Sequence, residues 1–300
     1  MNSVSLERRR LLEWPFKDTE QTIVARDVIL YALGIGAGAN PGDERDLRFV
    51  YEENLQTLPT MAAVLCSPGF SWYQDPRSGI DWKRMLHGEQ SIEIHSPLPT
   101  SGIVVGRTRV VEVVDRGTDK GALMTVERTL RNKACGTLLA TATAVMVLRG
   151  NGGFGGPAGP VSTPRVMPDR PADLSITTAI LPQAALIYRL SGDLNPLHVD
   201  PAVARAGGFA RPILHGLCTF GIVGRALIEG ACGFDPTRLR AMRARFTSPT
   251  YPGEAIRTDI WVGETVSFRA TVVGRDVVVL NNGSATVAPG RTAVLDAVPA

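Results

Sequence analysis

Three polar residues able to activate water, Asp193, Asn195 and His198, fall within six positions of one another. Pro196 lies among them and prevents a regular helix, so a turn would bring the carboxylate, the amide and the imidazole toward one small volume. The imidazole titrates near neutrality, the carboxylate can share or relay a proton, and the amide can both donate and accept hydrogen bonds. Such a trio can hold and activate one water molecule.

The same three residues also fit a purely structural interpretation. Asp193 would cap a turn, Asn195 would form an Asx-turn before the proline, and His198 would bond to a carbonyl group. A metal site is a second alternative, with Asp200 and His215 as additional ligands, although the residues lack a familiar ligand spacing.

A serine or cysteine nucleophile has little support in this region. Cys218 falls inside an apolar segment predicted to be helical, and Ser191 lacks the G-x-S-x-G elbow that presents a nucleophilic serine.

His215 and Gly216 would lie at the start of this predicted helix. Unpaired N–H groups and the helix dipole favour negative charge at that position, and glycine leaves its amide unobstructed. Such a donor could stabilise an oxyanion that develops during a reaction by about 3 kcal/mol, as in comparable oxyanion sites. We expect His215 itself to be structural, held by neighbouring backbone.

A glycine-rich segment, GNGGFG at residues 150–155, fits the G-x-G-x-x-G pattern of dinucleotide-binding proteins. A pyrophosphate site requires a helix to begin there and direct its N–H groups at the phosphate. Pro157, Pro160 and Pro164 prevent that helix, so we interpret the segment as a loop.

The elements that must position these residues follow the same order in both halves of the chain. Runs rich in β-branched residues predict strands connected by short turns, which suggests antiparallel meanders. The predicted strands are residues 103–114, 123–130 and 137–148, then 239–246, 255–262, 266–273 and 277–280.

Local echoes support a duplication: YALG at residues 31–34 resembles YRLS at 188–191. Residues 214–229 predict a long buried helix, since they are apolar on most sides and contain glycines that permit close packing. Residues 55–66 are the weaker candidate for the same role in the first half, with Pro59 near the helix start.

The composition of the 300 residues is that of a globular protein: 44% are hydrophobic, 20% are charged, and the net charge is +3. The arginines are scattered, so we expect no nucleic-acid partner. No secretory signal and no apolar stretch of about 20 residues is present, so we expect no membrane span. Four cysteines without a C-x-x-C pair indicate a reduced, cytoplasmic compartment.

The stretch YRLSGDLNPLHVDP at residues 188–201, with PILHGLCTFG at 212–221, resembles the signature of the MaoC-like (R)-specific enoyl-CoA hydratase 2 family. The resemblance extends into the first half and covers most of the chain. There, YALGIG (31–36), LRFVYE (47–52), LHGEQ (86–90) and GGFGG (152–156) resemble the hydratase region of peroxisomal multifunctional enzyme type 2.

The resemblance implies an α+β architecture, the double hot-dog fold, in which each of two units wraps a curved antiparallel sheet around a long helix. Residues 1–150 would form a degenerate unit that binds the acyl chain and CoA, and residues 173–290 the catalytic MaoC-like unit. A Gly/Pro-rich linker at 151–172 would join them, and 291–300 would form a tail.

The resemblance also implies roles for individual residues. Asp193 and His198 would be the catalytic pair, Asn195 their orienting partner, Gly216 the oxyanion donor and Glu52 a further acidic catalytic residue. His87, Gly88, Arg116 and Phe246 match positions that contact the CoA thioester, with Arg116 replacing the family's frequent lysine. Without the family, Glu52 would be a solvated acid, Arg116 a turn charge and Phe246 a core aromatic residue.

We therefore predict reversible syn hydration of a trans-2-enoyl-CoA to a (3R)-3-hydroxyacyl-CoA, part of fatty-acid metabolism and without cofactor or metal. The alternatives are a hot-dog thioesterase and a non-catalytic subunit that binds acyl-CoA or an acyl carrier. The sequence is compatible with a monomer or a homodimer.

Overall fold

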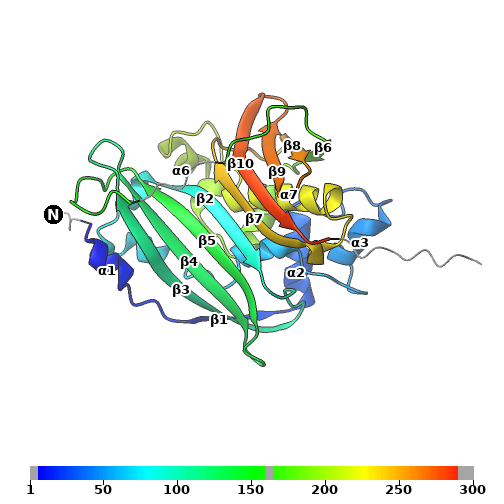
Figure 1. Cartoon of the computed structure of the whole chain (residues 1–300), viewed down its shortest axis with the longest axis horizontal. Coiled ribbons are helices and arrows are strands. Elements are labelled where there is room, and N and C mark those ends of the chain that lie inside the picture. The colour runs from blue at the N-terminus through cyan, green and yellow to red at the C-terminus, as the bar shows by residue number, and fades with distance from the viewer. Residues whose placement is uncertain (1–5, 160–164, 290–300) are drawn as a thin grey trace, which may run out of the picture.

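A computed structural model describes residues 6–159 and 165–289 of the chain. In this part of the chain ten strands form one antiparallel sheet in the order β1-β3-β4-β5-β2-β7-β10-β9-β8-β6 (Figure 1). The strands are β1 (Thr19–Ile23), β2 (Met85–Ile94), β3 (Gly102–Asp115), β4 (Ala122–Asn132), β5 (Leu138–Leu148), β6 (Leu174–Ala179), β7 (Leu239–Phe246), β8 (Ala255–Trp261), β9 (Val266–Val272) and β10 (Val277–Val287).

Short helices and one long helix cover the concave face of this sheet. The α-helices are α1 (Arg8–Leu12), α2 (Ala25–Gly34), α3 (Glu44–Val50), α4 (Ser71–Gln74), α5 (Ala184–Tyr188), α6 (Pro201–Ala206) and α7 (Gly216–Gly230). Short 3-10 helices are η1 (Pro59–Ala63), η2 (Pro76–Ser78), η3 (Trp82–Arg84), η4 (Arg189–Ser191), η5 (Pro196–His198) and η6 (Pro236–Arg238).

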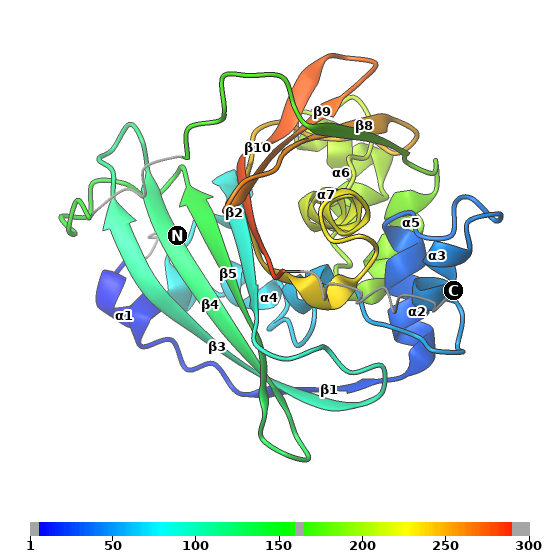
Figure 2. The ribbon, with the colours of Figure 1, turned by 45° about the vertical axis from the view of Figure 1, so that its right-hand side comes forward.

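The two halves of the chain meet where β2 pairs with β7, with Glu89 opposite Arg245 and Ile92 opposite Met242. Strands β1 to β5 lie on one side of this joint and β6 to β10 on the other. Figure 2 looks along α7 and shows the strands of the second half curving around it. The seven predicted strands are confirmed, and β1, β2 and β6 are additional.

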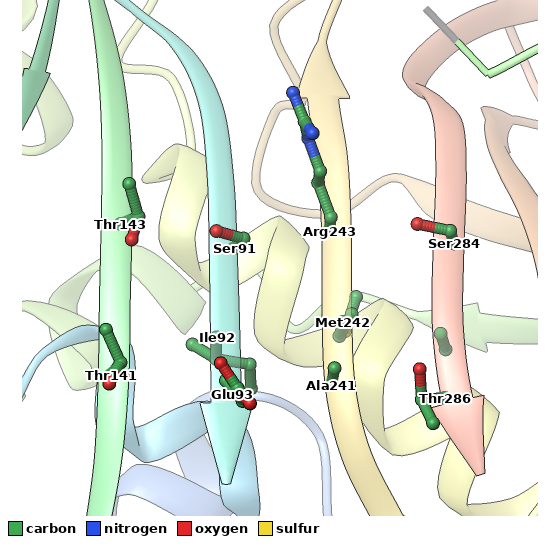
Figure 3. Close-up of a pocket in the computed structure, with 11 residues that line it drawn as sticks. Ser91, Ile92, Glu93, Thr141, Thr143, Ala241, Met242, Arg243, Ser284 and Thr286 are labelled. Atoms are coloured by element: carbon green, nitrogen blue, oxygen red, sulfur yellow. The ribbon is translucent and has the colours of Figure 1, made fainter. Parts of the chain in front are cut away.

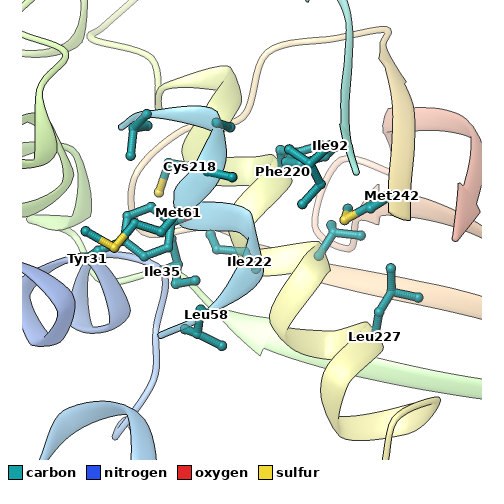
Figure 4. Close-up of a cluster of buried hydrophobic side chains, with 14 of the residues drawn as sticks. Tyr31, Ile35, Leu58, Met61, Ile92, Cys218, Phe220, Ile222, Leu227 and Met242 are labelled. Carbon is teal, nitrogen blue, oxygen red and sulfur yellow. The ribbon is translucent and has the colours of Figure 1, made fainter. Parts of the chain in front are cut away.

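The long helix α7 packs closely against the first half because glycines line its contact face. A Cβ atom at Gly221 would lie 2.7 Å from Ile35 Cγ2, and one at Gly224 would overlap Thr60 Cγ2. Side chains of the helix such as Phe220 share one core cluster with side chains of the first half such as Met61 (Figure 4).

The helix predicted at residues 55–66 is wrong. Only the five residues of η1 are helical there, and they form a 3-10 helix with Pro59 at its first position. All five are buried, and Thr60 lies directly beneath Gly224 of α7. Because α7 already occupies the concave face, the first half has no room for a second long helix, and the expectation of one such helix in each unit is corrected accordingly.

The glycine-rich segment after β5 folds back onto the first half. The Asp115 carboxylate accepts hydrogen bonds from the amides of Gly153 and Gly155, both at 2.8 Å. These N–H groups are therefore used within the chain. Residues 151–159 and 165–172, the described parts of the predicted linker, contain no helix or strand, while 160–164 and the predicted tail at 291–300 lie outside the described residues.

Candidate active site

The segment between α5 and α6 holds the three predicted polar residues. Asp193 Oδ1 accepts from the amide of Asn195 at 3.2 Å, and Asn195 Oδ1 accepts from the amide of Leu197 at 3.1 Å, which caps η5. His198 lies in η5, is 8% exposed, and its Nδ1 donates to the carbonyl oxygen of Ile213 at 2.9 Å.

These are the bonds of the structural interpretation, and each residue has a polar atom left over. Asp193 Oδ2, Asn195 Nδ2 and His198 Nε2 have no protein partner among the described residues. A carbonyl oxygen can only accept, so Nδ1 of His198 has the proton and Nε2 presents a lone pair. The segment thus offers two acceptors and an amide donor to a bound molecule.

His215 supports this segment from below. It precedes α7, is 1% exposed, and its Nε2 donates to the backbone oxygen of Asp193 at 3.1 Å. Its ring stacks on that of His198 at 3.7 Å, and Tyr188 lies 5.1 Å away. The predicted structural role of His215 agrees with these contacts.

Burial keeps both imidazoles neutral. The pKa of His198 is lowered, because desolvation outweighs its bond to Ile213 and the charge of Asp193. The pKa of His215 falls to about 4, first through desolvation and then through the neighbouring His198. At neutral pH, His198 is therefore able to accept a proton.

The substrate positions expected from distant strands gather at the start of α7. Phe246, the last residue of β7, lies beside Gly216: a Cβ atom there would be 3.2 Å from the Phe246 ring. His87 also packs against that ring, with centroids 4.8 Å apart. Gly216 itself is exposed. Gly88 forms a β-bulge directly after His87.

Arg116 lies farther along the same end of the sheet. It is in the turn between β3 and β4, half-buried, and strand pairing links this turn through β4 and β5 to the first residues of β2. The position suits a charge that attracts the distal part of a long anionic substrate.

Glu52 is not brought to this cluster. It follows α3, is exposed, and α3 is tied to the second half of α7 by an ion pair between Asp46 and Arg225. The amide of Gly216 lies at the opposite end of α7, which is roughly 20 Å long at 1.5 Å per residue. A catalytic role for Glu52 stays a prediction without a contact to support it.

The geometry disfavours a metal ion at this cluster. Ligand atoms of Asp193, His198 and His215 lie within 4.8 Å of one another. Tetrahedral zinc holds its nitrogen and oxygen ligands roughly 3.4 Å apart. The two imidazole planes differ by only 29°, so their lone pairs lie in nearly parallel planes and do not converge on one ion.

Comparison with known proteins matches both halves of the chain. Residues 22–150 match the model of the MFE-2 hydratase 2 N-terminal domain, and residues 163–282 match the MaoC like domain. A probable enoyl-CoA hydratase 2 of Dictyostelium discoideum is 36% identical over 95% of this chain and 98% of its own length. The chain belongs to the MaoC-like hydratase 2 family.

Other members of the family agree with this assignment. A 3-hydroxyacyl-thioester dehydratase of Mycobacterium tuberculosis is 40% identical over 88% of this chain and 93% of its own length. The crystal structure of a MaoC-like dehydratase from Phytophthora capsici superposes with a TM-score of 0.82 at 35% identity, covering 94% of this chain and 99% of that one. A Mycobacterium tuberculosis protein described as having a double hotdog fold also superposes, with a TM-score of 0.54 at 14% identity over 90% of this chain and 93% of that one, which shows the fold.

Sequence reasoning missed the packing partners of the site. Tyr188 and the stacked His198–His215 pair depend on a loop folding against a helix 17 residues later, which no local pattern reveals. Glu89 was visible only as one letter of the LHGEQ motif.

No helix in the described residues combines the length and apolar character needed to cross a membrane.

Proposed function

We propose that this member of the hydratase 2 family is an (R)-specific enoyl-CoA hydratase, a hydro-lyase that adds water reversibly to a trans-2-enoyl-CoA. The observation that supports this most directly is the set of atoms without a protein partner on Asp193, Asn195 and His198, in a segment that contacts His215, the residue before Gly216. Relatives named enoyl-CoA hydratase 2 match nearly the whole chain.

The reaction needs a base for water and an acid for C2 of the substrate. As water attacks C3, the pair formed by Asp193 and His198 accepts one of its protons, and the same pair then delivers a proton to C2. The family resemblance implies that both groups act from one face of the double bond, so that addition is syn and the product is the (3R)-hydroxyacyl-CoA.

Negative charge develops on the thioester oxygen during this step. The amide of Gly216 is the first of α7, where the helix dipole is positive and no intrahelical acceptor exists. Asn195 orients the water through its free amide group. The first half, which lacks such a trio, houses the acyl chain.

The scheme needs no cofactor or metal, since Asp193 and His198 handle the protons and the Gly216 amide stabilises the developing charge. Three buried, unpaired thiols, Cys66, Cys218 and Cys232, suit a reducing compartment and support a cytoplasmic location. Light scattering would distinguish a monomer from a homodimer, and in either state the proposed site lies within one chain.

The test follows the ultraviolet absorbance of the conjugated thioester in crotonyl-CoA and in a longer trans-2-enoyl-CoA, with chiral analysis of the product. We expect decay to the (3R) isomer, and a loss of at least about 100-fold in Asp193→Asn and His198→Gln proteins. Folded variants that both turn over at the parent rate would refute the mechanism. Release of free thiol from saturated acyl-CoA would instead identify a thioesterase.

A further inference from the structure

A buried carboxylate outside the catalytic segment lies at the joint between the halves. Glu89, on β2, is 6% exposed although it faces away from α7. It accepts hydrogen bonds from two arginines of β7: Arg245 Nε bonds to Oε1 at 2.6 Å, and the guanidinium of Arg243 bonds to Oε2. The three residues form an ion cluster across the pairing of β2 with β7.

The arginines alternate along β7 and point to the same outer face of the sheet. Figure 3 shows Arg243 extending away from the Ser91 and Ser284 hydroxyl groups, which line a shallow groove of about 210 Å³. The side chains of Arg243 and Arg245 are 47% and 33% exposed, so Glu89 is the most enclosed member of the ion cluster. Its single negative charge separates two positive ones.

The same residue also holds His87. The backbone oxygen of Glu89 accepts from His87 Nε2 at 3.0 Å, across a bulge in β2. The bulge requires glycine between them, because a Cβ atom at Gly88 would lie 2.8 Å from Val147 Cγ2. Glu89 thus contacts His87 through its backbone and Arg245, the neighbour of Phe246, through its side chain.

We infer that Glu89 is a positioning residue that fixes the spacing between His87 and Phe246 and so forms the seat of the acyl-CoA thioester. The inference rests on the proposed function, because it takes these two rings as walls of the thioester site. It assigns no proton transfer to Glu89, whose carboxylate is fully engaged by arginine.

The physical reason is the balance of charge at the joint. Removal of the carboxylate leaves two like charges two residues apart on one strand, without the counter-ion that draws β7 toward β2. Phe246 moves with β7 and His87 with β2, so the gap between their rings would widen. The catalytic segment is on neither strand and would keep its geometry.

The test measures substrate binding and turnover in Glu89→Gln protein. Calorimetric titration with butyryl-CoA, which has no double bond to hydrate, gives a Kd that is independent of the chemistry. We expect Kd and KM to rise about tenfold while kcat changes less than about threefold. Arg245→Met should act alike, the double variant should add little, and Arg245→Lys should retain most of the affinity because it keeps the charge.

The matched control is Glu127→Gln. Glu127 of β4 pairs with Arg109 of β3 on the same sheet, away from the β2–β7 joint. This variant should bind butyryl-CoA as the parent does. A Glu89→Gln protein with a lower unfolding midpoint but parental Kd and KM would overturn the inference, as would weak binding in both glutamine variants. A parent that binds butyryl-CoA yet hydrates no enoyl-CoA would refute the proposed function alone.

Discussion

Replacing Gly216 by proline removes one N–H group at the start of α7 at little structural cost. Proline is favoured at the first helical position, where the N–H has no intrahelical acceptor. The preceding residue, His215, already has φ −57° and ψ 135°, a conformation that proline tolerates in its neighbour. Gly216→Ala is the matched control, because it adds a Cβ atom and keeps the N–H.

Both variants introduce the same contact with Phe246, whose Cε1 atom would lie 3.2 Å from the new Cβ atom. A shift of a few tenths of an ångström relieves it, so we expect the two free energies of unfolding to agree within about 1 kcal/mol. The catalytic difference should be larger. Loss of one oxyanion donor costs about 2.7–4 kcal/mol, which is about 100- to 1,000-fold in kcat.

The assay compares kcat for crotonyl-CoA in Gly216→Pro and Gly216→Ala proteins, after thermal unfolding has shown equal midpoints. The ratio of the two rates reports replacement of the N–H group by the proline Cδ atom, since the Cβ contact with Phe246 is common to both variants. If the folded proline variant hydrates the substrate as fast as the alanine variant, the Gly216 amide does not stabilise the transition state.

Three further changes probe packing, thiol chemistry and pH. Gly224→Ala should destabilise the protein by about 1–3 kcal/mol because its Cβ atom overlaps Thr60 Cγ2, and adding Thr60→Ser should restore the unfolding midpoint; no recovery would place the strain elsewhere. Ellman's reagent at pH 8 should modify one thiol of the native protein quickly, that of exposed Cys135, whose pKa is lowered by its hydrogen bond to Thr137. The other three thiols, those of Cys66, Cys218 and Cys232, should react only after unfolding, because burial raises the pKa of each. A native protein with two rapidly reacting thiols would contradict this prediction. Desolvation lowers the pKa of His87 to about 4, below its ordinary value of 6.5, so the unfolded chain binds a proton first and stability falls as the pH drops from about 6.5 toward 4. Between pH 7.5 and pH 5 the free energy of unfolding in urea should fall by on the order of 2 kcal/mol more in the parent than in the His87→Gln protein. This value is an upper bound because the His87 ring is partly exposed. If the difference in unfolding free energy between the two proteins does not change with pH, the lowered pKa is refuted.

The strands that could be predicted are those whose β-branched runs lie between clear turn residues. β7 begins and ends where the pattern placed it, at Leu239 and Phe246. β2 was not predicted because its first residues, MLHGEQ, contain a glycine bulge and three polar side chains. They therefore lack the alternation of apolar and polar residues that is typical of a strand. The helix predicted at residues 55–66 does not form because α7 occupies the space it would need, and this competition is a tertiary effect.

The site divides in the same way. Asp193, Asn195 and His198 could be predicted as a group because one turn brings them together. His87 and Phe246 lie 159 positions apart and meet only because β2 pairs with β7, so they were identified through the family resemblance alone. For Glu52 the resemblance named a residue that the fold leaves exposed.

The presence of one long helix explains why a duplicated chain has one site. The chemistry requires a helix start for the oxyanion and a polar turn beside it, and α7 provides a single start, at Gly216. In the first half the segment after α2 turns through Gly36 and Gly38 at positive φ, and the amide of Gly38 donates to Asp46. Asp46 in turn pairs with Arg225 of α7. The segment after α2 thus anchors the second half of the shared helix, in place of a catalytic trio.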